Sequence, residues 1–144
     1  MNKLINTVLA TRAGFGITIL RVITGLTFAS HGSQKLFGLF GGYGLEGTGQ
    51  WMASIGITPG YLMALLAGSA EFFGGLALVI GLLVRPAAAS LIVAMLVAIF
   101  AVHIGNGFFM ATNGFEYALI LATISAALLV EGAGKFSLDR KIAG

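Results

Sequence analysis

Residues 61–84 form an apolar stretch that is long enough to cross a lipid bilayer, and Glu71 is the one charged residue within it. A transmembrane helix needs about 17–25 predominantly apolar residues, so this stretch meets the requirement of length. Arg21 lies in a second apolar stretch near the start of the chain. A charge at membrane depth is costly, and such residues usually face protein or water and have a partner. We therefore expect a membrane protein whose interior contains both charges.

The composition agrees with this reading and excludes several classes of site. Of the 144 residues, 58% are hydrophobic and 9% are charged, whereas soluble domains carry about a quarter charged residues. The length predicts a single integral membrane domain over residues 1–144. The chain has no cysteine, which excludes disulfides, Cys-ligated zinc and iron–sulfur clusters, and we expect no metal site. The lysines and arginines form no basic run, so no nucleic-acid partner is expected.

The apolar pattern predicts an all-α, four-transmembrane-helix up-down bundle. The spans are expected at about residues 14–31, 61–84, 86–103 and 116–131. Most basic residues fall near the two termini or in the turn between the second and third spans: Lys3, Arg12, Arg85, Lys135, Arg140 and Lys141. Cytoplasmic segments of membrane proteins carry an excess of such residues, which predicts that both termini are cytoplasmic.

Two segments outside the spans are expected to contact membrane lipid. The glycine-rich outer loop, residues 32–60, contains a short stretch at 50–55 that is predicted to be an interfacial helix with Trp51 as its anchor. A second interpretation makes Trp51 the gate of a site. The tail, residues 132–144, mixes basic and apolar residues and is expected to lie against anionic lipid, or to fray beyond Asp139.

Arg21 and Glu71 are predicted to form a buried ion pair. Arg21 lies ten residues before His31, and Glu71 lies ten residues after Tyr61. At the rise of an α-helix both would lie about 15 Å below the outer ends of their spans. Antiparallel packing would then bring them level, and the small residues around both would allow close approach. Such a pair either serves a function or fixes the register of the helices.

Five polar residues are predicted to form a binding or proton-relay pocket at the outer end of the bundle. His31 and Lys35 are four residues apart and share one face of a helix, with Gln34 beside them. His103 ends the third predicted span and Glu116 opens the fourth. Helix bundles build ligand sites from facing side chains in this way. A histidine at a helix end is otherwise an ordinary interfacial residue, and this alternative stays open.

Ordered motifs extend over nearly the whole chain and carry a resemblance to a known family. After the helix with Arg21 and Gly25 they are His31-Gly32-x-x-Lys35-Leu36-Phe37-Gly38, Glu71-Phe72-x-Gly74-Gly75, His103, Gly107-Phe108-Phe109, Gly114-Phe115-Glu116-Tyr117 and Gly134-Lys135-Phe136-Ser137-Leu138-Asp139. Together they resemble the DoxX family of small bacterial four-helix proteins of the cytoplasmic (inner) membrane. The resemblance implies a redox association, because founding relatives are membrane subunits of a thiosulfate:quinone oxidoreductase. Without cysteine, a thiol-based scheme does not carry over.

These observations favour a quinone-associated membrane subunit of a redox system. Histidine and lysine can donate to quinone carbonyls, and histidine exchanges protons near neutral pH. A redox-partner protein would have to supply electrons, so the chain is not expected to be a complete enzyme alone. Haem held by His31 and His103 is less favoured, because the flanking glycine loops make poor haem walls. Two alternatives remain: a non-enzymatic binder or carrier of a small molecule, and a scaffold for a membrane complex.

Overall fold

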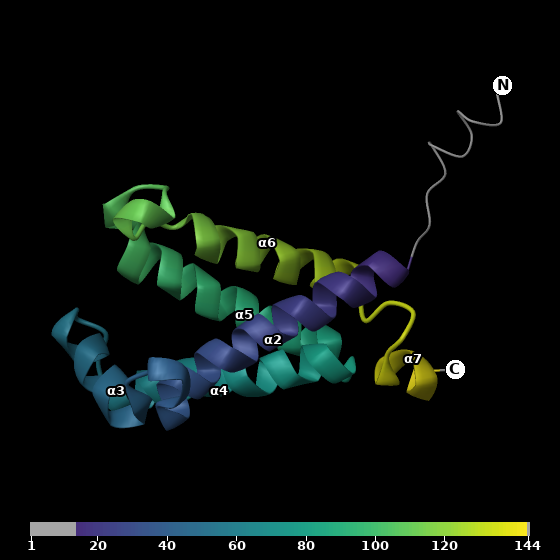
Figure 1. Ribbon diagram of the computed structural model, residues 1–144, viewed down its shortest axis with the longest axis horizontal. Coiled ribbons are helices and arrows are strands. Elements are labelled where there is room, and N and C mark those ends of the chain that lie inside the picture. The colour runs from purple at the N-terminus through teal and green to yellow at the C-terminus, as the bar shows by residue number, and fades with distance from the viewer. Residues whose placement is uncertain (1–13, 144) are drawn as a thin grey trace, which may run out of the picture.

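The structure is a computed structural model that describes residues 14–143, and these residues form helices and turns without a strand (Figure 1). This confirms the all-α prediction for that part of the chain. Lys3 and Arg12, which contributed to the predicted orientation, lie outside the described residues. Two helical stretches, Gly60–Ile80 and Val84–Asn106, are long and apolar enough to cross a membrane by length and composition.

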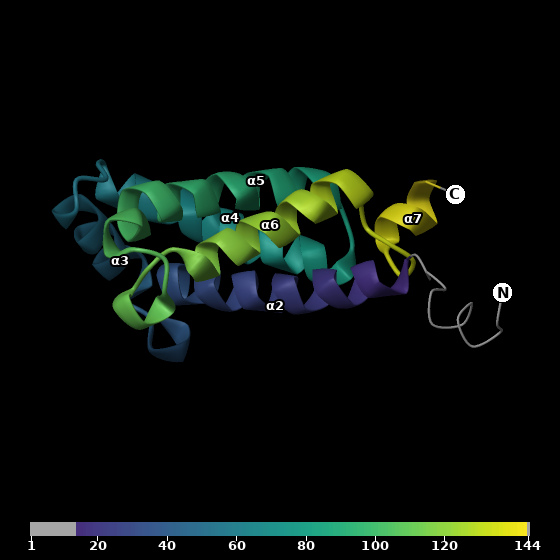
Figure 2. The ribbon, with the colours of Figure 1, turned by 90° about the horizontal axis from the view of Figure 1, so that it is seen from above.

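Four long helices lie alongside one another, and the chain direction alternates from each to the next (Figure 2). They are α2 (Phe15–Phe37), α4 (Gly60–Ile80), α5 (Val84–Val97) and α6 (Glu116–Glu131). A π-helical turn, Ala98–His103, continues α5. The shorter helices lie at opposite ends of the molecule: α3 (Gly44–Ser54) at one and α7 (Leu138–Ala143) at the other (Figure 1). We refer to these as the α3 end and the α7 end. Short 3-10 turns at Leu39–Gly41, Ile104–Asn106 and Met110–Thr112 complete the loops of the α3 end.

The ends of the first two long helices differ from the predicted spans. Helix α2 continues past residue 31 to Phe37 and ends at Gly38, whose φ of 69° is left-handed. Helix α4 ends at Ile80 rather than at residue 84, because Gly81 has a φ of 73° and its N–H bonds back to the Ala77 carbonyl. Glycine adopts this conformation without steric cost and commonly ends helices. The predicted limits followed hydropathy, which does not register these stops.

Glycines allow α2 and α4 to pack with their backbones in contact. A Cβ on Gly32 would overlap the backbone of Phe72, and one on Gly75 would overlap the backbone of Ala29. Gly25 lies in the same way against the Gly75 carbonyl. Small residues at helix interfaces are how membrane helices approach closely. These contacts fix the register in which the two helices pass one another.

The short helix of the glycine-rich loop is longer than predicted, since α3 begins at Gly44 rather than at residue 50. It packs on the start of α4, where a Cβ on Gly60 would overlap the Gly49 carbonyl. Thus Gly49 and Gly60 serve close packing of two helices, and this part of the segment is not an open loop. Trp51 lies on α3 and is 41% exposed, and its role as an interfacial anchor stays a prediction.

The core lies between the four long helices, and their outer faces are apolar as well. Phe28, Leu78, Leu91 and Leu128, one from each long helix, are fully buried. Large apolar side chains on the outside of the same helices are more than half exposed: Ile23, Phe73, Val93 and Ile120. Soluble monomers rarely expose apolar surface on this scale. Lipid would cover such a surface.

Candidate functional site

The centre of the candidate site is an ion pair between Lys35 of α2 and Glu71 of α4. The lysine Nζ lies 2.6 Å from Glu71 Oε2 and donates a hydrogen bond to it. The Glu71 side chain is 5% exposed, whereas the Lys35 side chain is 25% exposed. This is the one ion pair between side chains in residues 14–143. A buried carboxylate is costly unless it is paired, and Lys35 supplies this partner to Glu71.

The local sequence explains why Lys35 can reach Glu71. Gly32 lies three residues before Lys35 and therefore on the same face of α2. Because Gly32 has no Cβ, α2 rests on the backbone of Phe72, the residue after Glu71. On the next turn, Leu36 and the stem of Lys35 pack over Gly68. The motif His-Gly-x-x-Lys thus combines close packing with the placement of a cation.

Three aromatic residues stand next to the ion pair in the chain: Phe72 and Phe73 follow Glu71, and Phe37 lies two residues after Lys35. Phe72 makes edge-to-face contacts with Phe37 and with Phe73, at centroid distances of 5.2 and 5.1 Å. Phe37 and Phe73 are 56% and 62% exposed, so the rings face outward from the helices. Edge-to-face pairs of this kind contribute to packing beyond the area that they bury. The two helices that hold the buried ion pair therefore also carry an exposed aromatic surface.

The predicted ion pair between Arg21 and Glu71 is wrong. Arg21 is 1% exposed, and its guanidinium donates to the carbonyl oxygens of Leu78 (2.6 Å), Val79 (3.2 Å) and Phe136. The estimate of depth failed because α2 continues to Phe37, which moves Arg21 away from Glu71 and toward the α7 end. There the guanidinium caps the last carbonyls of α4, which have no partner within their own helix.

Two other charged residues at the α7 end bind backbone groups that have no partner within their own helix. The Asp139 carboxylate accepts hydrogen bonds from the N–H groups of Leu83 (2.7 Å) and Val84 (2.9 Å) at the start of α5. Arg85 donates to the carbonyls of Leu129 and Val130 at the end of α6, each at 3.1 Å. Each charge has the sign that complements its helix end. We call Arg21, Arg85 and Asp139 the capping charges of the α7 end.

The predicted outer cluster is only partly assembled. His31 lies one turn before Lys35, within electrostatic range of Lys35 and Glu71, and its ring is 6.0 Å from that of Tyr117 on α6. His103 instead joins the loop between α5 and α6, with its Nδ1 2.9 Å from the Asn113 carbonyl oxygen.

The other two residues of the predicted cluster, Gln34 and Glu116, also make contacts that do not involve the Lys35–Glu71 pair. Gln34 donates from its Nε2 to the Phe40 carbonyl at 3.2 Å, which ties α2 to the loop that follows it. Glu116 opens α6 and lies next to Tyr117 in the chain, and its backbone N–H bonds to the Phe108 carbonyl. The site therefore centres on His31, Lys35 and Glu71, while Gln34 and His103 hold loops. No group of three or more His, Asp or Glu suited to a metal occurs within residues 14–143.

Two features of the structure were not foreseen from the sequence. Helical spacing predicts Lys35 beside His31, but the estimate of depth pairs Glu71 with Arg21 instead of Lys35. The signal that could have corrected this was Gly38, because a helix that runs to a glycine stop places Lys35 within it. Asp139 was not singled out, and its capping role depends on the tail folding back over the α4–α5 turn. Nothing local in the sequence indicates that return.

The chain is similar to known proteins along most of its length. The model of the DoxX family matches residues 16–104. An uncharacterized protein of Haemophilus influenzae is 33% identical over 132 residues, 87% of this chain and 89% of the relative. A protein of Bacillus subtilis named "Putative oxidoreductase CatD" is 35% identical over 113 residues, 78% of each chain. The inner membrane protein YqjF of Escherichia coli is 31% identical over 128 residues, 87% of this chain and 90% of the relative. No solved structure matches.

Proposed function

The chain belongs to the DoxX family, and from this premise we propose that it is a multi-pass bacterial inner-membrane protein and a quinone-associated subunit of a redox system. The site is centred on Lys35, Glu71 and His31. One observation carries the proposal: a buried Lys35–Glu71 ion pair on two helices that also hold a cluster of aromatic rings, those of Phe37, Phe72 and Phe73. The names of two relatives, an inner membrane protein and an oxidoreductase called putative, are compatible with it.

In this proposal all four long helices cross the membrane as an up-down bundle, with both termini in the cytoplasm. The distribution of charge between the two ends of the molecule supports this orientation. Arg85, Lys135, Arg140 and Lys141 lie at the α7 end, while Glu46 and Glu116 open helices at the α3 end. Basic residues concentrate on the cytoplasmic side of membrane proteins. The Lys35–Glu71 site then lies toward the outer side.

A quinone fits this site for two reasons of chemistry. Its ring and tail are apolar and suit the surface formed by Phe37, Phe72 and Phe73 beside the lipid phase. Its carbonyl oxygens accept hydrogen bonds, and Lys35 is a donor whose side chain is only partly buried. Sites for small organic ligands combine an apolar surface with a few polar groups, and α2 and α4 supply both.

Reduction of a quinone to a quinol takes up two electrons and two protons. Lys35, Glu71 and His31 are the groups placed to hand over protons, because each can carry one and the three are neighbours. The electrons come from a redox-partner protein, and this chain contributes the binding site and the route for protons. The polypeptide is then one subunit of an oxidoreductase and not the whole enzyme.

Binding of a short-chain ubiquinone analogue to the purified protein tests the proposal. Trp51 is the only tryptophan, so quenching of its fluorescence can report binding. We expect saturable binding by the wild type and a loss of at least about tenfold in affinity in Glu71→Gln, because a neutral amide does not hold the Lys35 ammonium as a charged partner does. Glu46→Gln is the matched control, since Glu46 is an exposed glutamate at the start of α3.

Three outcomes would reject this function. The first is absence of saturable quinone binding. The second is equal affinity in wild type and Glu71→Gln. The third is a Soret band in the purified protein, which would assign a haem to His31 or His103 instead. Mass spectrometry of lipid extracted from the wild type in mild detergent should, in addition, detect a co-purified quinone.

The orientation has its own test, which uses the absence of natural cysteine. A single cysteine at Ala111, exposed in the loop before α6, is expected to react with a membrane-impermeant maleimide in intact spheroplasts. A cysteine at Ala143, exposed at the end of α7, is expected to react only after the membrane is opened. The reverse pattern would invert the orientation, and labelling of both in sealed cells would show that the two ends lie on the same outer side.

A further inference from the structure

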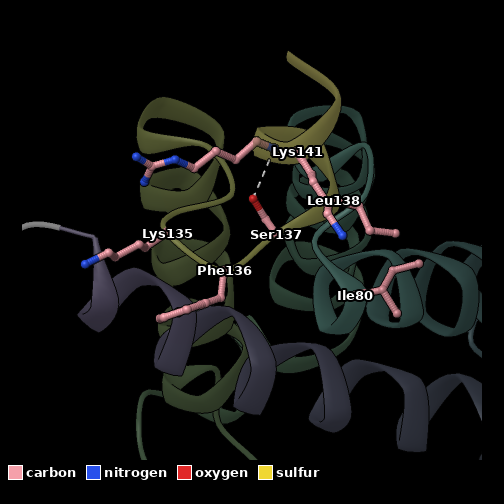
Figure 3. A pocket seen from close by; sticks show the side chains of 7 residues that line it. Ile80, Lys135, Phe136, Ser137, Leu138 and Lys141 are labelled. Carbon is pink, nitrogen blue, oxygen red and sulfur yellow. Dashed lines mark hydrogen bonds between the residues drawn. The ribbon is translucent and has the colours of Figure 1, made fainter. Parts of the chain in front are cut away.

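The tail after α6 carries a surface that the proposed redox role does not use. Residues 135–142 contain three cations, Lys135, Arg140 and Lys141, and three large exposed apolar side chains. Phe136, Leu138 and Ile142 are 61%, 41% and 75% exposed. Ile80 at the end of α4 lines the same shallow, open depression with Ser137 between the two sides (Figure 3). We call this the tail surface.

The tail is held in place by contacts at Phe136 and Asp139, which fix where its backbone runs. Arg21 donates to the Phe136 carbonyl, and the Asp139 carboxylate binds the N–H groups that open α5. The Asp139 N–H in turn donates to the Gly81 carbonyl at 2.9 Å. The Phe136 ring also packs edge-to-face on Phe15 of α2, at 5.9 Å. The tail is therefore tied to the fold as far as Asp139, and the chain continues in α7, Leu138–Ala143.

The cations of the tail surface are not used within the described part of the molecule. Within residues 14–143, no carboxylate pairs with Lys135, Arg140 or Lys141, and their side chains donate no hydrogen bond there. In Figure 3 Lys141 lies on the same side as Leu138 and Ile80, while Lys135 and Phe136 lie on the opposite side, toward α2. On both sides a cation is next to an apolar side chain.

We propose that the tail surface binds the headgroup of an anionic phospholipid of the inner leaflet. The phosphate contacts the cations, while Phe136, Leu138 and Ile142 enter the boundary between headgroups and acyl chains. Segments with this mixture of cations and large apolar residues lie in the membrane interface. Complementary charge decides the lipid class, since zwitterionic lipid offers no net charge to three cations.

Competitive retention of phosphatidylglycerol and phosphatidylcholine by the full-length purified protein, read by native mass spectrometry, tests the proposal. One cation near an anionic surface contributes about a fivefold preference, so we expect the wild type to prefer phosphatidylglycerol by at least about tenfold. The triple variant K135Q/R140Q/K141Q should lose this preference. The matched control K135R/R140K/K141R keeps every charge and should retain it.

A second measurement keeps the test decisive if the glutamine variant does not fold. Raising the salt concentration from about 0.05 M to about 0.5 M should reduce the wild-type preference, because exposed charges are screened. An unchanged preference in the folded glutamine variant would overturn the proposal, and so would a preference that is insensitive to salt. A third outcome would also overturn it: the glutamine variant retains lipid as the wild type does but no longer co-purifies with an acidic protein. The tail surface would then bind a protein partner.

Discussion

Replacement of Glu71 by leucine is expected to lower the free energy of unfolding by about 3 kcal/mol, because it leaves the Lys35 ammonium without its partner inside the protein. Loss of one member of a buried pair costs about 3–5 kcal/mol, and the lower figure applies here since a quarter of the Lys35 side chain is exposed. Reversible unfolding in mixed micelles with increasing dodecyl sulfate would measure the change.

The double variant Lys35→Met/Glu71→Leu separates the cost of an unpaired charge from the value of the pair. With both charges replaced by apolar side chains of similar size, stability is expected to return to within about 1 kcal/mol of the wild type. Quinone binding is expected to stay lost, because the donor is gone. If binding returns together with stability, the pair is scaffolding and the redox proposal loses its site. If Glu71→Leu alone is as stable as the wild type, the two side chains are not paired.

Arg21→Met is expected to have the second large effect, about 3–5 kcal/mol of unfolding free energy. Three carbonyl oxygens, those of Leu78, Val79 and Phe136, lose a charged donor, and each such bond contributes about 1.5–3 kcal/mol. Water near the membrane surface can hydrogen-bond to some of these carbonyl oxygens in the variant, so the expected loss of stability is smaller than the sum of the three hydrogen bonds. The same variant should also release the tail, because the guanidinium joins Phe136 to the end of α4.

Limited proteolysis with trypsin distinguishes this role from a general loss of stability. Cleavage after Lys135 is expected to be at least about tenfold faster in Arg21→Met than in the wild type under conditions where both are folded. Arg85→Met is the matched control, since Arg85 caps α6 through the Leu129 and Val130 carbonyls and donates no hydrogen bond to residues 135–143. Equal acceleration in both variants would contradict a specific role for Arg21 at the tail.

Some features of the site can be predicted from the sequence, and others cannot. His31 and Lys35 were expected on one helical face, four residues apart, because helical periodicity is a local property of the chain. The need of Glu71 for a partner also followed from the sequence, since an apolar stretch cannot bury a lone carboxylate at little cost. The identity of that partner did not follow. It depends on how far α2 continues and on which residues of α4 lie opposite.

The sequence by itself determined that this chain is helical, that its apolar stretches suit a membrane, that it belongs with the DoxX proteins and that its few internal charges need partners. The family follows from the resemblance of the ordered motifs, while the other properties depend on composition and local periodicity, which no distant contact alters. Only the tertiary structure decided that Lys35, and not Arg21, pairs with Glu71, and that Arg21 and Asp139 fix the tail. The physical reason is register: glycine stops set the helix ends, and backbone contact at Gly25, Gly32 and Gly75 sets how far α2 slides along α4.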